Sequence, residues 1–121
     1  MATDDKLIDK IKTCCNKVHG ELGPGFVERI YHCALKVALD EEKLDFDSEK
    51  DFSVFYQDQR VGSFKCDFFV ENKIVVLVKA QMENFSAEAL LQAKAYFKIS
   101  KTQSLLLVNF GKTEIQVEKI A

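Results

Sequence analysis

Two segments near the amino terminus have the hydrophobic spacing of helices. A capping side chain at Thr3, followed by two acids, predicts a helix that ends near Gly20. Its apolar positions are Leu7, Ile8, Ile11, Cys14, Cys15 and Val18. After the Gly and Pro residues at 23–25, a second helix is predicted from about Gly25 to Lys43. It is apolar at nearly every position outside one polar stripe, so we expect it to be largely buried. The stripe consists of Arg29, His32, Lys36 and Asp40.

The spacing then changes from helical to alternating. Apolar and polar residues alternate from Phe52 to Tyr56, a turn is expected over 57–60, and a second alternating strand ends at Val70. On one face of that strand we expect Phe64, Cys66, Phe68 and Val70, and on the other Ser63, Lys65, Asp67 and Phe69. After a turn at 71–73, the continuous apolar run 74–78 predicts a central strand that is covered on both faces.

The last third of the chain predicts one helix and two strands. Ser86 is a good cap for a helix that continues to about Ser100. A fully apolar strand is predicted over 105–110, and an alternating edge strand over 114–120. The element order ααβββαββ predicts an α/β fold with a mixed sheet flanked by helices. With a single Pro and five Gly there is no sign of a linker, so we predict one domain over residues 1–121.

Composition and charge limit the class of protein and its possible partners. The chain is 47% hydrophobic, enough for a real core, and its net charge of −2 gives no overall attraction to a polyanion. Between residues 89 and 113, however, there is no acid. That stretch holds four lysines, which form either an ordinary solvated surface or a local basic face for phosphate. They are Lys94, Lys98, Lys101 and Lys112.

The cysteines and the hydropathy point to a reduced, cytoplasmic protein. No apolar run approaches the roughly 18 residues that a membrane span needs, so we expect no membrane association. The four cysteines form no CxxC pair, and we expect all of them to be small core residues rather than metal ligands. They are Cys14, Cys15, Cys33 and Cys66.

Three residues on the predicted elements could take part in phosphodiester cleavage. Glu28 lies at the border of the helical polar stripe, where a carboxylate reaches solvent or faces a metal or cationic partner. Asp67 lies inside an apolar segment and needs compensation from Lys79, Lys65, a metal or water. We expect Lys79 on the same sheet face as Asp67, either as its ion-pair partner or as a lysine beside a metal-binding acid.

The orientation of the third helix is open. If Gln92 and Tyr96 turn toward Asp67 and Lys79, the outer side of the helix presents an apolar stripe, and a symmetric dimer would cover it. That stripe would consist of Leu90, Leu91, Lys94 and Phe97. In the alternative orientation, Leu90 and Phe97 lie in the core and Gln92 is exposed.

Several motifs of other enzyme classes are missing from the sequence. His19 and His32 have no spacing typical of zinc ligands. There is no Ser or Cys nucleophile motif and no glycine-rich phosphate loop, which argues against triad hydrolases and nucleotide-binding enzymes.

Taken together, short segments along nearly the whole chain resemble the GxxExxY family, a small group related to the PD-(D/E)XK nuclease superfamily. Val18-His19 and residues 22–25, with Glu28 and Tyr31, match the naming motif. Residues 67–70 match the strand of the superfamily aspartate, and residues 74–80 match the strand that normally ends in Glu-x-Lys-Ala. Gln92 with Tyr96 matches the helix that follows, and residues 106–111 match the closing strand.

The resemblance implies a restriction-endonuclease-like αβββαβ core. It also implies a site of Glu28, Asp67, a strand glutamate, Lys79 and Gln92, in which acids hold Mg²⁺. Leu77 stands where the strand glutamate belongs, and Glu49 stands where the family often has glutamine. Because Mg²⁺ requires several oxygen ligands, we expect Mg²⁺ binding to be weak or absent. Asp67 and Glu28, with the Val78 carbonyl, could still form a poorer metal site.

Three functions are compatible with this pattern. The first is a degenerate nuclease-like protein with lost or weak phosphodiesterase activity, which acts as a binding or assembly module. The second is an active Mg²⁺-dependent nuclease that uses Glu28, Asp67 and Lys79, and the joint presence of these residues with Gln92 favours it. The third is a scaffold that only keeps the fold.

Overall fold

The predicted order of elements is confirmed. The computed structural model describes residues 4–120, so the proposed cap at Thr3 lies outside the described residues. The elements are α1 (Asp4–Leu22), α2 (Glu28–Glu41), β1 (Phe46–Tyr56), β2 (Gln59–Val70), β3 (Ile74–Lys79), α3 (Ala87–Ser100), β4 (Ser104–Asn109) and β5 (Gln116–Ile120). No helix within the described part of the chain is both long and apolar enough to cross a membrane.

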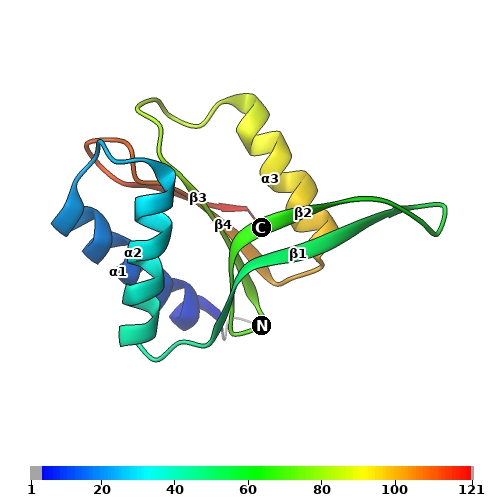
Figure 1. Ribbon diagram of the computed structural model, residues 1–121, viewed down its shortest axis with the longest axis horizontal. Coiled ribbons are helices and arrows are strands. Elements are labelled where there is room, and N and C mark those ends of the chain that lie inside the picture. Colours follow the sequence, from blue (N-terminus) through cyan, green and yellow to red (C-terminus); the bar gives the residue numbers. More distant parts are fainter. Residues whose placement is uncertain (1–3, 121) are drawn as a thin grey trace.

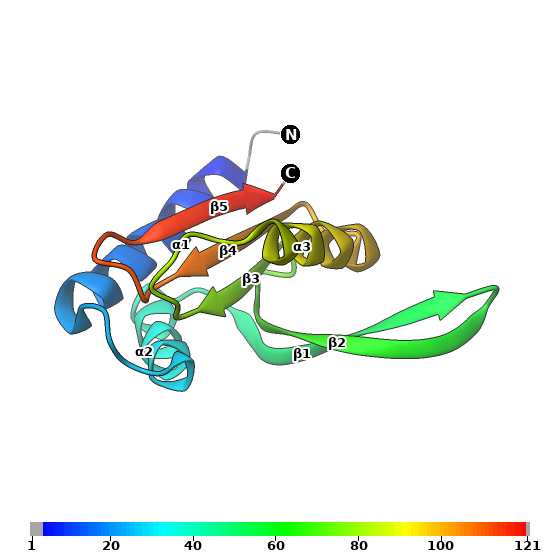
Figure 2. The same ribbon diagram turned by 90° about the horizontal axis from the view of Figure 1, so that it is seen from above.

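The strands form one mixed sheet between two helical layers. The strand order is β1-β2-β3-β4-β5, in which β3 and β4 are parallel and the other neighbours are antiparallel. Figures 1 and 2 show α1 and α2 on one side of the sheet and α3 on the other. This is the expected restriction-endonuclease-like α/β fold. The crossover from β3 to parallel β4 runs through α3, whose Ser86 cap accepts a hydrogen bond from the Ala89 N–H, as predicted.

Two hydrophobic clusters hold these layers together. One joins α1 and α2 to the sheet through residues such as Tyr31, Leu35, Phe68 and Val76. The other joins α3 to the opposite face. Every residue of β4 and all but the last residue of β3 are buried, because both strands lie under helices on both faces. The run 74–78 is therefore a central strand, as its composition predicts.

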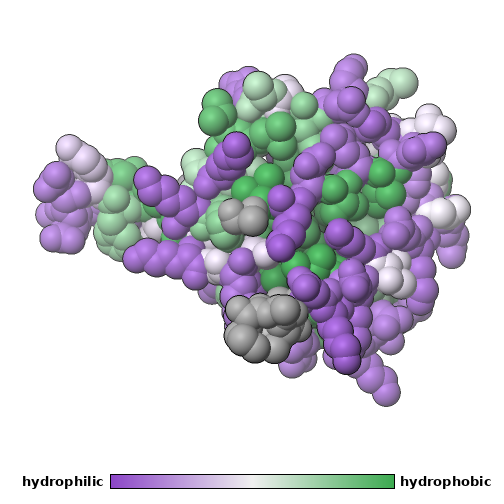
Figure 3. Space-filling model, turned by 180° about the vertical axis from the view of Figure 1, so that it is seen from behind, coloured by the Kyte–Doolittle hydropathy of each residue, from purple (hydrophilic) through white to green (hydrophobic). Residues whose placement is uncertain are grey.

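Strands β1 and β2 extend beyond the sheet as a long hairpin. Strand β2 pairs with β3 only from Phe68 to Val70, but it pairs with β1 along nearly its whole length. In Figure 3 this hairpin protrudes from the body of the molecule. Its turn residues Gln57 and Asp58 both have positive φ, the geometry of a two-residue hairpin turn. Strand β1 begins at Phe46, six residues before the predicted start, because the acids in that stretch hide its alternation.

The expected faces of β2 are wrong at one point. Cys66 packs in the α3 cluster, but Phe68 packs in the α1–α2 cluster, so two residues of equal parity lie on opposite faces. The switch occurs beside Asp67, where the facing residue Glu49 of β1 has a left-handed φ of 57° and the ladder skips the pair. A distorted backbone at this point explains why strict alternation fails.

Helix α2 is less buried than its composition predicts. One side packs on the sheet, but the opposite side leaves apolar residues in solvent, among them Ile30 and Val37. Cys33 is also exposed, contrary to the expectation of four core cysteines. The other three are buried, and burial raises the pKa of Cys15 to about 12 and that of Cys66 to about 11.

Candidate functional site

The candidate site lies where β2 and β3 separate. The ladder between these strands ends at the pair Phe68 and Val76, and the hairpin then leaves the sheet. Asp67 is the next residue of β2 beyond this point. Its Oδ2 accepts a hydrogen bond of 2.7 Å from the Val78 N–H. The carboxylate thus replaces the missing ladder partner of β3, which satisfies a buried backbone donor.

The second oxygen of Asp67 is taken by His32. The distance from His32 Nδ1 to Asp67 Oδ1 is 2.9 Å, and the distance from His32 Nε2 to Ser48 Oγ is 3.2 Å. The imidazole ring also stacks on Phe68, with 4.6 Å between the ring centroids. His32 is only 6% exposed, so this member of the predicted polar stripe is buried.

His32 is the site residue that sequence reasoning missed. Its spacing of four residues from Glu28 places both on one helix face, and this was the available signal. Ser48, His32 and Asp67 stand in the order of a hydrolase triad. We interpret these linked hydrogen bonds as structural, because they satisfy both nitrogens of a buried imidazole and one oxygen of a strand carboxylate.

Glu28 lies in the first turn of α2 and interacts electrostatically with the same group. Its side chain is still reached by solvent. Partial removal from water raises the pKa of the Glu28 carboxyl, and the charge of Asp67 adds to the rise. Lys79 and His32 oppose it. The structure therefore brings Glu28, Asp67 and Lys79 together, with His32 among them.

Lys79 ends β3 and is half-buried. Its charge favours the ionised form of Glu28. The direct form of the expected pair with Asp67 is not found, since the ion pair of Asp67 within the described residues is with His32, and pairing through water stays a prediction. Lys79 therefore lies at the edge of the cluster, and the His32 imidazole is the ion-pair partner of Asp67 that the sequence suggested Lys79 would be.

The segment after Lys79 is held by Asn109, a fully buried residue at the end of β4. Its Oδ1 accepts hydrogen bonds from the N–H groups of Gln81 and Gly111, both at 3.0 Å, and its Nδ2 donates to the Glu83 carbonyl at 3.0 Å. A Cβ on Gly111 would lie 2.4 Å from the Gln81 nitrogen, so only glycine fits. These contacts fix the backbone that leaves the site.

Leu77 lies on the other face of the sheet, in the cluster beneath α3. It is 5% exposed and packs with Phe85, Ala93 and Leu107. Position 77 therefore supplies no carboxylate, and its side chain makes apolar contacts instead.

The donor set lacks one carboxylate of the usual superfamily Mg²⁺ site. Asp67 has a hydrogen-bond partner on each oxygen, and Leu77 offers no oxygen. Glu28 remains as the one uncommitted carboxylate among the predicted ligands, whereas Mg²⁺ requires near-octahedral oxygen coordination. Within residues 4–120, no group of three or more His, Cys, Asp and Glu side chains is placed to hold a metal ion.

Gln92 and the lysines lie elsewhere. On α3, Leu90, Tyr96 and Phe97 pack against the sheet, whereas Gln92 is exposed. The orientation with Gln92 turned to the site is therefore wrong, because Tyr96 stacks on Phe64, with 3.9 Å between ring centroids, and fixes the helix. The outer side of α3 carries Lys94 and Lys98, Lys101 is the left-handed residue that ends the helix, and Lys112 hydrogen-bonds to Asn84 in another loop.

Comparisons with known proteins agree with this geometry. Curated proteins include no match to the chain. Among solved structures, the crystal structure of SSO0001 is similar, with a TM-score of 0.60 and 16% identity over 76% of this chain and 48% of that one. At this identity the likeness shows the fold alone, and the chain spans about half the length of that structure.

The family comparison extends over almost the whole sequence. A model of the PD-(D/E)XK nuclease superfamily matches residues 5–120. The narrower assignment to the GxxExxY group stays a prediction. The match includes the strand with Asp67, the strand with Lys79 and the helix with Glu28. The chain belongs to the PD-(D/E)XK nuclease superfamily.

Proposed function

We propose that this chain is a PD-(D/E)XK domain that has lost most or all of its phosphodiesterase activity and works as a binding or assembly module. The observation that carries the proposal is the state of the two strand positions that hold the metal in this superfamily. Leu77 is buried among apolar side chains, and both oxygens of Asp67 are bound by His32 and the Val78 N–H. With no acid at position 77 and a hydrogen bond already on each Asp67 oxygen, we expect Mg²⁺ binding, and the catalysis that depends on it, to be weak.

A cleavage assay tests this function. The purified protein is incubated with single- and double-stranded DNA and RNA in Mg²⁺ or Mn²⁺, with Lys79→Ala prepared in parallel to reveal a contaminating nuclease. The expected result is no cleavage above the level of Lys79→Ala. Metal-dependent cleavage that disappears in both Asp67→Asn and Lys79→Ala would refute the proposal.

The alternative function is an active Mg²⁺-dependent nuclease. It is favoured by the grouping of Glu28, Asp67 and Lys79 at the open end of β3, where Lys79 and Asp67 both influence the Glu28 carboxyl. In that case Glu28 would supply the carboxylate that Leu77 does not. Metal-dependent cleavage lost in Glu28→Gln would support this alternative.

A binding role has one candidate surface for nucleic acid, the outer side of α3. Lys94 and Lys98 are exposed one turn apart on the helix, Lys101 is exposed at its carboxyl end, and all three would meet phosphate groups without base specificity. Fluorescence anisotropy with a labelled oligonucleotide at several salt concentrations tests it. Binding that weakens in the triple Lys→Glu variant and with added salt would support the role, and equal weak binding by both proteins would exclude it.

A further inference from the structure

Helix α2 has a second apolar side that faces away from the sheet. Ile30, Cys33 and Val37 follow at intervals of three and four residues and lie on one line of the helix, and Phe26 precedes the helix. We call these four residues the α2 outer stripe. All four are exposed, Val37 at 58%. A helix that is apolar on both sides is typical of a helix covered on both sides.

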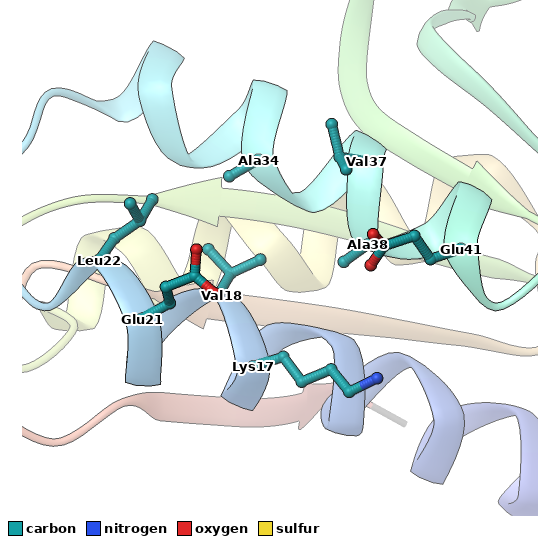
Figure 4. Close-up of a pocket in the computed structure, with 8 residues that line it drawn as sticks. All are labelled: Lys17, Val18, Glu21, Leu22, Ala34, Val37, Ala38 and Glu41. Atoms are coloured by element: carbon teal, nitrogen blue, oxygen red, sulfur yellow. The ribbon is translucent and has the colours of Figure 1, made fainter.

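A hollow lies beside this stripe, between α1 and α2. The open groove has a volume of about 510 Å³, and Figure 4 shows side chains from both helices along it. Its apolar residues are Val18, Leu22, Ala34, Val37 and Ala38, and Lys17, Glu21 and Glu41 are its charged ones. Val37 belongs to both features, so stripe and groove form one continuous surface.

The bulky and hollow parts of this surface lie toward opposite ends of α2. The large side chains Phe26 and Ile30 are near its amino end, and the part of the groove formed by Ala34, Val37 and Ala38 extends from its middle toward its carboxyl end. An antiparallel two-fold contact brings the amino half of one helix against the carboxyl half of the other. We infer that a second copy of this chain covers the surface, with each Phe26 and Ile30 seated at the partner's α1–α2 groove.

Two of the charges beside the stripe fit the same arrangement, whereas Lys36, on the same flank, would lie near its own copy. Arg29 and Asp40 are exposed on one flank of α2, eleven residues or about three helical turns apart. In an antiparallel pair centred between them, Arg29 of each copy faces Asp40 of the partner subunit. The two helix dipoles are also antiparallel, which is favourable. Arg29 bonds Glu49 in its own chain at an exposed position, and its guanidinium has further donors.

Helix α3 offers no comparable surface. Leu91, 67% exposed, is the large apolar side chain that α3 leaves in solvent among the described residues. The self-association predicted from the sequence therefore moves from α3 to α2. This dimer rests on the assembly role proposed above, and the partner in that role is a second copy of the chain.

Sedimentation velocity over about 1 to 100 μM tests the dimer. We expect wild type to dimerise in this range. Val37→Lys and Ile30→Lys each place a charge in the contact and should weaken dimerisation about tenfold or more. Leu91→Lys is the matched control, with the same change at an exposed helical position, and should leave the dimer intact. Circular dichroism confirms that each variant is folded.

Charge reversal and cross-linking test the antiparallel arrangement. Arg29→Asp and Asp40→Arg should each weaken the dimer, and the double variant should recover part of the loss. Cys33, the exposed cysteine, lies near the centre of the contact, with helix axes expected ~8–10 Å apart. A short bismaleimide should therefore join two copies through Cys33 in wild type and fail in Val37→Lys.

Two results would overturn the dimer. One is a monomer at the highest concentration. The other is a dimer that Leu91→Lys disrupts but Val37→Lys does not. Neither result bears on cleavage, which is measured separately. A monomer that leaves nucleic acids intact would therefore refute this interface but not the proposed loss of nuclease activity.

Discussion

The two faces of the sheet differ at the point where β2 and β3 separate. On the α2 face, Asp67 keeps a full set of hydrogen bonds to His32 and Val78. On the α3 face, Leu77 lies in an apolar cluster. The contrast teaches that Asp67 has a structural task that needs no metal, whereas position 77 has an apolar one. Asp67 accepts hydrogen bonds from a backbone N–H and a buried imidazole. An acid at position 77 would have no partner other than a metal, and without the metal its burial would destabilise the core.

The largest expected effect is that of removing Asp67. Asp67→Ala leaves His32 Nδ1 and the Val78 N–H without their acceptor, and we expect a loss of about 3–5 kcal/mol in the free energy of unfolding. Urea denaturation measures it. Asp51→Ala, an exposed acid on the same hairpin, is the control and should change stability by less than ~0.5 kcal/mol. Equal stability of the two variants would show that Asp67 is not a structural residue.

The opposite face is tested by shortening Leu77. Leu77→Ala leaves a cavity beneath α3, and we expect a loss of about 2–4 kcal/mol by the same denaturation. Leu77→Met conserves volume and should cost less than ~1.5 kcal/mol. If the alanine variant were as stable as wild type, Leu77 would fill a space that the fold does not need, and the comparison of the two faces would fail.

A smaller effect is expected at His32. His32→Phe keeps a ring that can stack on Phe68 but leaves Asp67 Oδ1 and Ser48 without their partner, at a cost of roughly 1–3 kcal/mol. In a double-mutant cycle with Asp67→Asn, the two losses should be less than additive, because both changes remove the same contact. Strict additivity would contradict a structural pair.

The smallest effect is the pH dependence contributed by Glu28. Its pKa is raised in the folded protein, chiefly by removal from water, so the folded state binds more protons than the unfolded state just above pH 4.5. Stability from this group is therefore greatest at low pH and falls as the pH rises through the folded pKa. Thermal melts of Glu28→Gln should lack this decline, and identical pH profiles would show that Glu28 is fully solvated.

The sequence predicts the layers well and the site only in part. Strands such as 74–78 and 105–110 are recognisable because burial on both faces requires continuous apolar runs. The faces of β2 are not, because the left-handed Glu49 breaks an alternation that sequence reasoning assumes. His32 resembles a surface residue on a helical wheel, since its half-buried partners Ser48 and Asp67 come from strands far along the chain.

A calorimetric titration with Mg²⁺ and Mn²⁺ tests the central claim most directly, because it measures the ligands rather than the reaction. The account predicts little or no binding to wild type. Leu77→Glu should not restore it, because the side chain at position 77 lies on the α3 face, away from Asp67, and circular dichroism confirms that this variant is folded at the titration temperature. Micromolar binding of Mg²⁺ by wild type, abolished by Asp67→Asn, would contradict the claim that the metal site has been lost.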